Sequence, residues 1–443
     1  MKKLCILFLV SLVLLASCAT VGNDVSKNDI SQGGESSQAV SSDQSSQTVS
    51  VDRGESLLAR GDLMQLVSAK QVEGKQIDEA FRQSQMRLAM ELFEACSSAS
   101  EGKNVLISPL SIQLALAMTA NGASGETLEE MQALLGGDIP LDELNAYLYE
   151  YVGSLPSSDK YKVELANSIW FREQNGFEVY ESFLQTNADY YKSQAYAAPF
   201  DDTTVEQINK WVEVHTDGMI KKVIEDIDPL TMMYLINALV FDAEWASPYD
   251  EYSVHDGTFT ALGGRVCDVE YMSAEEGYYL ETKDAVGFAK NYKDGKYRFA
   301  ALLPDEGVDV YDYIASLDGE TLLDALDNME SASVFATMPK FSYEYDLEMT
   351  DVLSALGMPT AFTDGADFSA MSNHDLHIGT VIHKTFIEVA EKGTRAGAVT
   401  AVGMMEEGVP MYKAVIKLDR PFVYLIIDAE TNLPLFVGAV TEL

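Results

Sequence analysis

The side chains that most often carry out chemistry are few in this 443-residue chain, and they match no catalytic motif. None of the five histidines belongs to an HExxH zinc motif, and no serine lies in a GxSxG turn. His374 and His377 flank Asp375, but a single HDLH turn is more typical of a solvated loop than of a metal site. The residues give no support for an enzyme, and we expect neither a metal nor a cofactor.

Residues 391–421 show a different pattern, which suits a segment that is soluble when exposed and can also be inserted into a packed interior. The segment follows an alternating apolar run, Phe386-Ile387-Glu388-Val389, that is typical of a strand. Between residues 393 and 403 the side chains are small, and Arg395 is the only charge. In an extended chain one face would carry no charge. That face would consist of Thr394, Ala396, Ala398, Thr400 and Val402. Taken alone, the pattern also fits a surface loop or an alanine-rich helix.

The neighbouring blocks decide between these possibilities. EKGTRAGAVTA, followed by LDRPFVYLII and LPLFVGAV, resembles the hinge, reactive-centre loop and carboxy-terminal hairpin of the serpin family. Earlier blocks, including SPLS at residues 108–111, occur in family order, so the resemblance covers about residues 81–443. It implies an α+β fold with a large central sheet, further sheets and about eight or nine helices. The exposed reactive-centre loop would span about residues 391–417.

The resemblance implies a suicide inhibitor of serine proteases rather than an enzyme. The protease would attack the loop and form an acyl-enzyme, and the freed hinge would then insert into the central sheet as an extra strand. The alternative is a non-inhibitory member that uses the same fold as a surface binding or structural protein. The small hinge residues favour the inhibitor, although Val399 is larger than is usual there.

The resemblance also implies roles for particular residues. The hinge would comprise Glu391, Gly393, Thr394, Ala396, Gly397, Ala398 and Thr400. The "breach", where insertion begins, would contain Trp245 and Lys340, with Lys340 paired to Glu391. The "shutter" under the sheet would contain Ser108, Ser111, Asn237 and His383. From its apolar strand pattern alone, His383 is expected to be a hydrogen-bonded core histidine.

The position of the scissile bond stays open among three residues. Counting forward from Gly393 by family spacing places Glu407 on the acyl side, whereas counting back from Arg420-Pro421 suggests Glu406. A shift of one residue admits Met405. Glutamate would favour a glutamyl-specific protease, and methionine an elastase-, subtilisin- or chymotrypsin-like enzyme. A trypsin-type target is not expected, because the nearest basic residue, Lys413, is too far along the loop.

Composition bounds the remaining properties. The formal net charge of −40 argues against a nucleic-acid partner, because phosphate binding requires clustered Lys and Arg. The 47% hydrophobic content is ample for a large core. We expect a monomer.

Four cysteines are too few to indicate a fold that is held together by disulfides. Cys96 lies on an apolar helical face, which predicts a buried thiol.

The amino terminus resembles that of an exported bacterial lipoprotein. A basic start is followed by LCILFLVSLVLLAS and then Cys18, which predicts a signal peptide at residues 1–17 and a lipid anchor on Cys18. Cleavage elsewhere or an uncleaved anchor helix are the alternatives. Residues 18–56 are rich in Ser and Gln and predict a flexible tether. The serpin-like domain would be 57–443, held at a membrane and facing the extracellular side.

The elements that must position these residues can also be predicted. Residues 81–96 have a helical apolar face, and residues 105–107 form a short strand that leads into a helix capped by Ser108 with Pro109 in its first turn. Residues 232–245 are apolar on both faces and predict a strand in the middle of a sheet. Strands and helices alternate without a regular βαβ pattern, which indicates the α+β class.

Overall fold

The computed structural model describes residues 48–50, 61–100, 102–173, 176–229, 231–394 and 411–443. The predicted signal peptide and the anchor residue Cys18 lie outside these ranges. Of the predicted tether the structure describes only Thr48–Ser50, which forms strand β1. No helix in the described ranges is long and apolar enough to cross a membrane.

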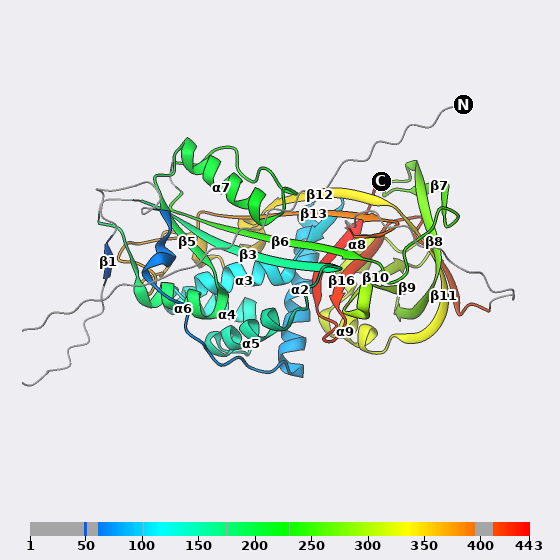
Figure 1. Cartoon of the computed structure of the whole chain (residues 1–443), viewed down its shortest axis with the longest axis horizontal. Coiled ribbons are helices and arrows are strands. Elements are labelled where there is room, and N and C mark those ends of the chain that lie inside the picture. Colours follow the sequence, from blue (N-terminus) through cyan, green and yellow to red (C-terminus); the bar gives the residue numbers. More distant parts are fainter. Residues whose placement is uncertain (1–47, 51–60, 101, 174–175, 230, 395–410) are drawn as a thin grey trace, which may run out of the picture. The chain divides into compact units, whose positions relative to one another are not determined.

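Helices and strands interleave without a repeating strand–helix–strand unit (Figure 1), which confirms the α+β class. The predicted helix at residues 81–96 and the helix capped by Ser108 are both present. The described α-helices are α2 (Glu79–Ala99), α3 (Pro109–Ala120), α4 (Gly125–Gly136), α5 (Leu141–Ser154), α6 (Glu181–Tyr191), α7 (Asp202–His215), α8 (Val310–Ser316), α9 (Gly319–Asp327) and α10 (Thr350–Ala355). Their number agrees with the expected eight or nine.

A six-stranded sheet forms the centre of the fold. In spatial order its strands are β12 (Phe341–Glu348), β13 (Thr380–Ala390), β14 (Gly393–Thr394), β6 (Met233–Glu244), β3 (Tyr161–Arg172) and β5 (Gln194–Ala198). Helix α7 lies on one side of β3 and β6, and α3, α4 and α5 lie on the other (Figure 1). Tyr234 and Ile236 of β6 pack in the cluster under α7, while Leu235 joins the main core. This explains why β6 is apolar on both faces.

A second sheet is larger and has nine strands among the described residues. In spatial order its strands are β15 (Ala414–Lys417), β11 (Glu330–Pro339), β8 (Val266–Thr282), β9 (Ala285–Asn291), β10 (Tyr297–Pro304), β16 (Phe422–Asp428), β17 (Pro434–Val440) and β2 (Val105–Ile107), and β7 (Val254–Thr260) pairs with β8. Strand β1 pairs with β4 (Glu178–Tyr180) in a separate ribbon. The central sheet and the further sheets were both expected.

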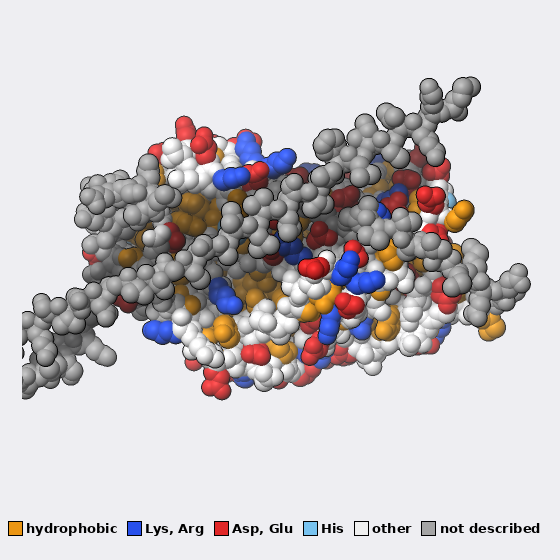
Figure 2. Space-filling view, viewed as in Figure 1, with side chains coloured by type: hydrophobic (Ala, Val, Ile, Leu, Met, Phe, Trp, Pro, Cys, Tyr) orange, Lys and Arg blue, Asp and Glu red, His pale blue; other side chains and the backbone are white. Residues whose placement is uncertain are grey.

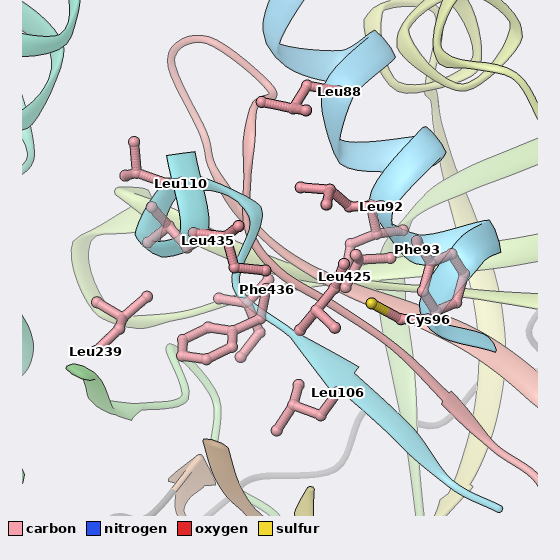
Figure 3. Packing of buried hydrophobic residues seen from close by; sticks show 14 of the residues in the cluster. Leu88, Leu92, Phe93, Cys96, Leu106, Leu110, Leu239, Leu425, Leu435 and Phe436 are labelled. Carbon is pink, nitrogen blue, oxygen red and sulfur yellow. The ribbon is translucent and has the colours of Figure 1, made fainter. Parts of the chain in front are cut away.

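Helix α2 supplies much of the core that supports the second sheet. Its residues Leu88, Leu92, Phe93 and Cys96 point toward Leu425 and its neighbours on β16 and β17 (Figure 3). Cys96 is fully buried, which confirms the prediction, and burial raises the pKa of its thiol to about 12. A thiol in this environment is unreactive because the thiolate is the reactive form.

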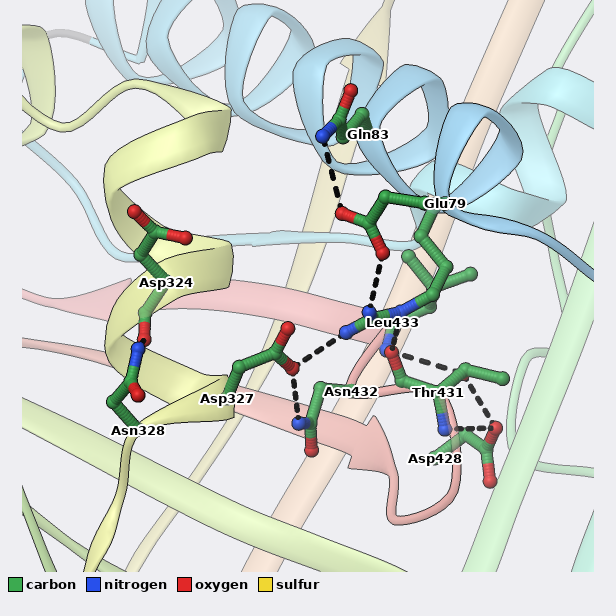
Figure 4. Close-up of polar contacts among 10 residues, drawn as sticks. Glu79, Gln83, Asp324, Asp327, Asn328, Asp428, Thr431, Asn432 and Leu433 are labelled. Atoms are coloured by element: carbon green, nitrogen blue, oxygen red, sulfur yellow. Dashed lines mark hydrogen bonds and ion pairs between the residues drawn. The ribbon is translucent and has the colours of Figure 1, made fainter.

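Polar contacts fix the start of α2 to the same sheet. Arg82 binds the Asp327 carboxylate at the end of α9 at 2.5 Å, and its Nε donates to the Thr431 carbonyl oxygen at 2.9 Å. Asn432, in the turn between β16 and β17, donates to Asp327 at 2.8 Å (Figure 4). Since the guanidinium also contacts Glu79, one side chain joins two helices and a hairpin turn.

Candidate functional site

The functional site predicted from the sequence lies where two strands of the central sheet separate. Strands β13 and β6 pair directly, in parallel, only where Thr380–Ile382 meets Tyr234–Ile236. Within the described residues, no ladder pairing joins residues 383–388 of β13 to residues 237–241 of β6. We call these two segments the unpaired stretch. Their facing backbone groups are available to one further strand.

Strand β14 lies next to this stretch, at the carboxy-terminal ends of β13 and β6. Gly393 pairs with Ala390 and Glu244, and Thr394 pairs with Val389, antiparallel in each case. A Cβ atom on Gly393 would come within 2.0 Å of the Ala243 carbonyl oxygen, so only glycine fits without displacing β6.

The pairing of β14 corrects the expectation that the reactive-centre loop is exposed along the whole of residues 391–417, because Gly393 and Thr394 lie inside the sheet. Thr394 is only 3% exposed, and its hydroxyl is hydrogen-bonded to the phenol of Tyr292. The hinge therefore begins inside because a buried partner is available for the threonine hydroxyl. The other hinge and scissile-bond candidates lie outside the described residues: Ala396, Gly397, Ala398, Thr400, Met405, Glu406 and Glu407.

The predicted breach residue Trp245 holds the chain just before β14. It follows β6, is fully buried, and stacks on the Tyr292 ring with centroids 4.3 Å apart. Its indole N–H donates to the Ala390 carbonyl oxygen at 2.9 Å, and its backbone N–H donates to the Lys392 carbonyl oxygen at 2.8 Å. Trp245 thus connects the end of β6 to the end of β13 across the point where the strands separate.

The predicted ion pair of the breach is also formed. The Lys340 ammonium lies 2.5 Å from a Glu391 carboxylate oxygen and 3.1 Å from one of Glu270. The hydrogen bond from Lys340 lowers the pKa of the Glu391 carboxyl below its ordinary value. Because Glu391 is partly exposed, water screens the pair and its contribution to stability is modest.

The four predicted shutter residues are brought together at the end of the unpaired stretch where β13 and β6 begin to separate. His383 Nε2 accepts from the backbone N–H of Ser108 at 3.1 Å, and the Ser108 hydroxyl caps α3 by accepting from the Ser111 N–H at 3.3 Å. The Ser111 hydroxyl donates to Asn237, whose amide donates to Asn167. This chain of hydrogen bonds links β13, α3, β6 and β3. Sequence analysis missed Asn167, although a polar residue within an apolar strand was the available signal.

The buried His383 predicts a loss of stability in acid. Burial lowers the pKa of His383 to about 3, and Nδ1 has no partner among the described residues. In the unfolded chain the pKa is about 6.5, so below that pH the unfolded state binds a proton that the native state does not. The free energy of unfolding should fall by about 1.4 kcal/mol per pH unit between pH 6 and pH 4 from this residue alone. Urea unfolding of the wild type and of His383→Gln would measure it.

In His383→Gln the acid dependence should be shallower by that amount. The glutamine oxygen can still accept from Ser108, so the comparison isolates the titration. Equal slopes in the two proteins would contradict the assignment of a neutral, buried imidazole.

No group of three or more His, Cys, Asp or Glu side chains in the described ranges is placed to hold a metal ion. His374 contacts the Asn373 side chain in a loop, and His377 lies 3.9 Å from Asp364.

A central sheet in which β14 pairs with both β13 and β6 beside the hinge agrees with the class of protein that the resemblance implied, the serpins. The chain belongs to the serpin family: the profile described as "Serpin (serine protease inhibitor)" matches residues 83–443. Members of this family are typically protease inhibitors and not enzymes.

Individual relatives agree with this assignment. The crystal structure of the thermophilic serpin tengpin in its native state is 46% identical with a TM-score of 0.83, covering 87% of this chain and all of that one. An uncharacterized serpin-like protein of Thermococcus kodakarensis is 33% identical over 354 residues, which are 77% of this chain and 81% of the relative. Human thyroxine-binding globulin, solved in complex with thyroxine, is 26% identical with a TM-score of 0.74, covering 82% of this chain and 99% of that one.

Proposed function

We propose that this protein is an inhibitory serpin that traps a serine protease as its acyl-enzyme. After cleavage, the chain beyond Thr394 would extend β14 into the unpaired stretch between β13 and β6. The observation that carries the proposal is the seating of β14, which already pairs antiparallel with both neighbours. The first residues of the new strand are therefore in register before any protease arrives.

Continuing that register gives each hinge residue a partner. Ala396 would lie opposite Ile387, and Ala398 opposite Thr385, both of which face the interior and are nearly fully buried. Thr400 would lie opposite His383 and so bring a hydroxyl to the shutter. The uncharged face of the hinge is thus the face that would be buried.

The energy of insertion is sufficient to distort a captured enzyme. A dozen new ladder hydrogen bonds at about 0.5–1.5 kcal/mol each contribute on the order of 10 kcal/mol. A protease domain is stable by about 5–15 kcal/mol. Because the two quantities are comparable, pulling on the acyl-enzyme can disorder its active site and stop deacylation.

Family membership alone does not establish inhibition, since thyroxine-binding globulin shares the fold and was solved with thyroxine bound. The pairing of β14 with both neighbours and the small residues after it favour the inhibitor.

We further propose that the protein is a bacterial lipoprotein anchored through Cys18, monomeric, and displayed outside the cell. Acidic side chains are spread over the visible surface (Figure 2), as expected from 70 acidic and 30 basic residues.

The target class can be tested directly. Purified protein would be mixed with elastase-, subtilisin-, chymotrypsin- and glutamyl-type proteases, and the products separated in SDS. We expect a covalent complex with at least one of them, and a released carboxy-terminal peptide that begins at Glu406, Glu407 or Gly408, corresponding to cleavage after Met405, Glu406 or Glu407. A protease whose active-site serine is blocked is the control. Complete cleavage without any complex would contradict the proposal.

A further inference from the structure

A buried ion pair lies directly behind the breach. Lys290 on β9 and Glu276 on β8 are joined by a 2.7 Å contact, with side chains only 2% and 8% exposed. Taking two charges out of water is costly, and such a pair is often no more stabilising than apolar residues of the same size. A contribution to stability alone therefore does not account for it.

The ammonium of Lys290 faces two aromatic rings. It lies 4.3 Å from the centroid of the Tyr249 ring and 5.6 Å from that of the Trp245 ring. Both distances are within the range of a cation–π attraction, which is strengthened by the absence of water. Lys290 can therefore hold both rings in one arrangement, while Glu276 neutralises its charge.

The same two aromatic residues hold the hinge. The Tyr249 backbone N–H donates to the Glu391 carbonyl oxygen, and the Trp245 backbone N–H donates to the Lys392 carbonyl oxygen, each at 2.8 Å. Trp245 also stacks on Tyr292, whose phenol is bonded to Thr394. These contacts fall on Glu391, Lys392 and Thr394, at the start of β14 and just before it.

We propose that Lys290, neutralised by Glu276, is a positioning residue for the hinge. By fixing the rings of Tyr249 and Trp245, it maintains the hydrogen bonds from their backbone N–H groups to the carbonyl oxygens of residues 391 and 392. These bonds keep β14 paired between β13 and β6. Its effect on inhibition rests on the proposed function. If β14 pairs less firmly with β13 and β6, insertion after cleavage is delayed, and the acyl-enzyme is hydrolysed more often. Attack on the loop itself is unaffected, because Lys290 is only 2% exposed and cannot contact a docked protease.

The test is the double variant Lys290→Met with Glu276→Gln, which removes both charges and keeps the side-chain sizes. Amide hydrogen exchange of Trp245 and Tyr249 should accelerate by about tenfold. With a target protease, the number of inhibitor molecules consumed per complex should rise by about threefold or more, while the rate of loop cleavage is unchanged. Lys290→Arg, which keeps the cation, should retain the slow exchange.

The matched control is Lys210→Met with Glu213→Gln, an exposed pair on α7 with the same 2.7 Å separation. It should change neither measurement. If the first double variant does not fold, Tyr249→Leu removes the ring and keeps the ion pair, and the same faster exchange at Trp245 is expected. Unchanged exchange in the variant that folds would overturn the proposal. Because exchange is measured without a protease, it decides the positioning role even if the wild type forms no covalent complex.

Discussion

Ala396→Asp is expected to convert the protein from an inhibitor of serine proteases into a substrate. In the register set by β14, residue 396 lies opposite Ile387, which is 3% exposed, so the new carboxylate would enter the interior without a partner. Burying it costs several kcal/mol, a large part of the roughly 10 kcal/mol that drives insertion. Such a cost slows insertion by about a hundredfold or more, and deacylation then wins.

The measurement is electrophoresis in SDS after mixing with a target protease. The wild type should give a covalent complex, and Ala396→Asp should give cleaved protein and active enzyme. Val399→Asp is the matched control, because it places the same charge on the opposite face, beside Lys384 of β13, which already binds the carboxylates of Glu344 and Asp346. Equal loss of the complex in both variants would mean that β14 does not set the register.

Cutting the loop without trapping a protease is expected to raise the melting temperature by about 10 °C or more. The cut allows residues after Thr394 to complete the ladder on both sides of the unpaired stretch, at on the order of 10 kcal/mol. For a domain of this size, about 1 kcal/mol corresponds to roughly 1 °C or slightly more, by extension from smaller domains. Calorimetry of the intact and the nicked protein would show the change.

The comparison is the change in melting temperature when the loop of the Ala396→Asp variant is cut in the same way. Its melting temperature should rise much less, because the buried carboxylate opposes the new strand. A nicked wild type that melts at the temperature of the intact protein would exclude loop insertion, and with it the proposed trapping mechanism. The fold and the family would be unaffected by that result.

Many local features could be predicted because they depend on near neighbours in the chain. The cap of α3 is an example, since Ser108 and Pro109 act within one turn and the structure places both as expected. The central position of β6 followed from its apolar residues on both faces. The ion pair of Lys340 with Glu391 and the grouping of the shutter residues required the family resemblance, because spacing alone does not bring distant segments together.

Other features depend on which strands meet, and no local pattern predicted them. Asn167 enters the shutter because β3 lies opposite β6 in the register that pairs it with Asn237. Lys290 meets Tyr249 and Trp245 only because a bridge between Trp245 and Tyr292 joins the residue after β6 to the residue after β9. In the sequence, Lys290 and Glu276 are two charges in a partly apolar region, with no sign that both are buried.

The amino-acid sequence by itself determined the periodicity of the elements, the uncharged face of the hinge and the family to which the chain belongs. The tertiary structure decided that the hinge begins inside the central sheet, at Gly393 and Thr394. The pairing of Gly393 and Thr394 requires the close approach of the Ala243 carbonyl oxygen, which belongs to β6, and of the phenol of Tyr292, which follows β9. Strand propensity depends on residues that are close in the sequence. Insertion of a strand into a sheet also requires free backbone groups on the two neighbouring strands, and side chains beneath them that can pack or hydrogen-bond with it.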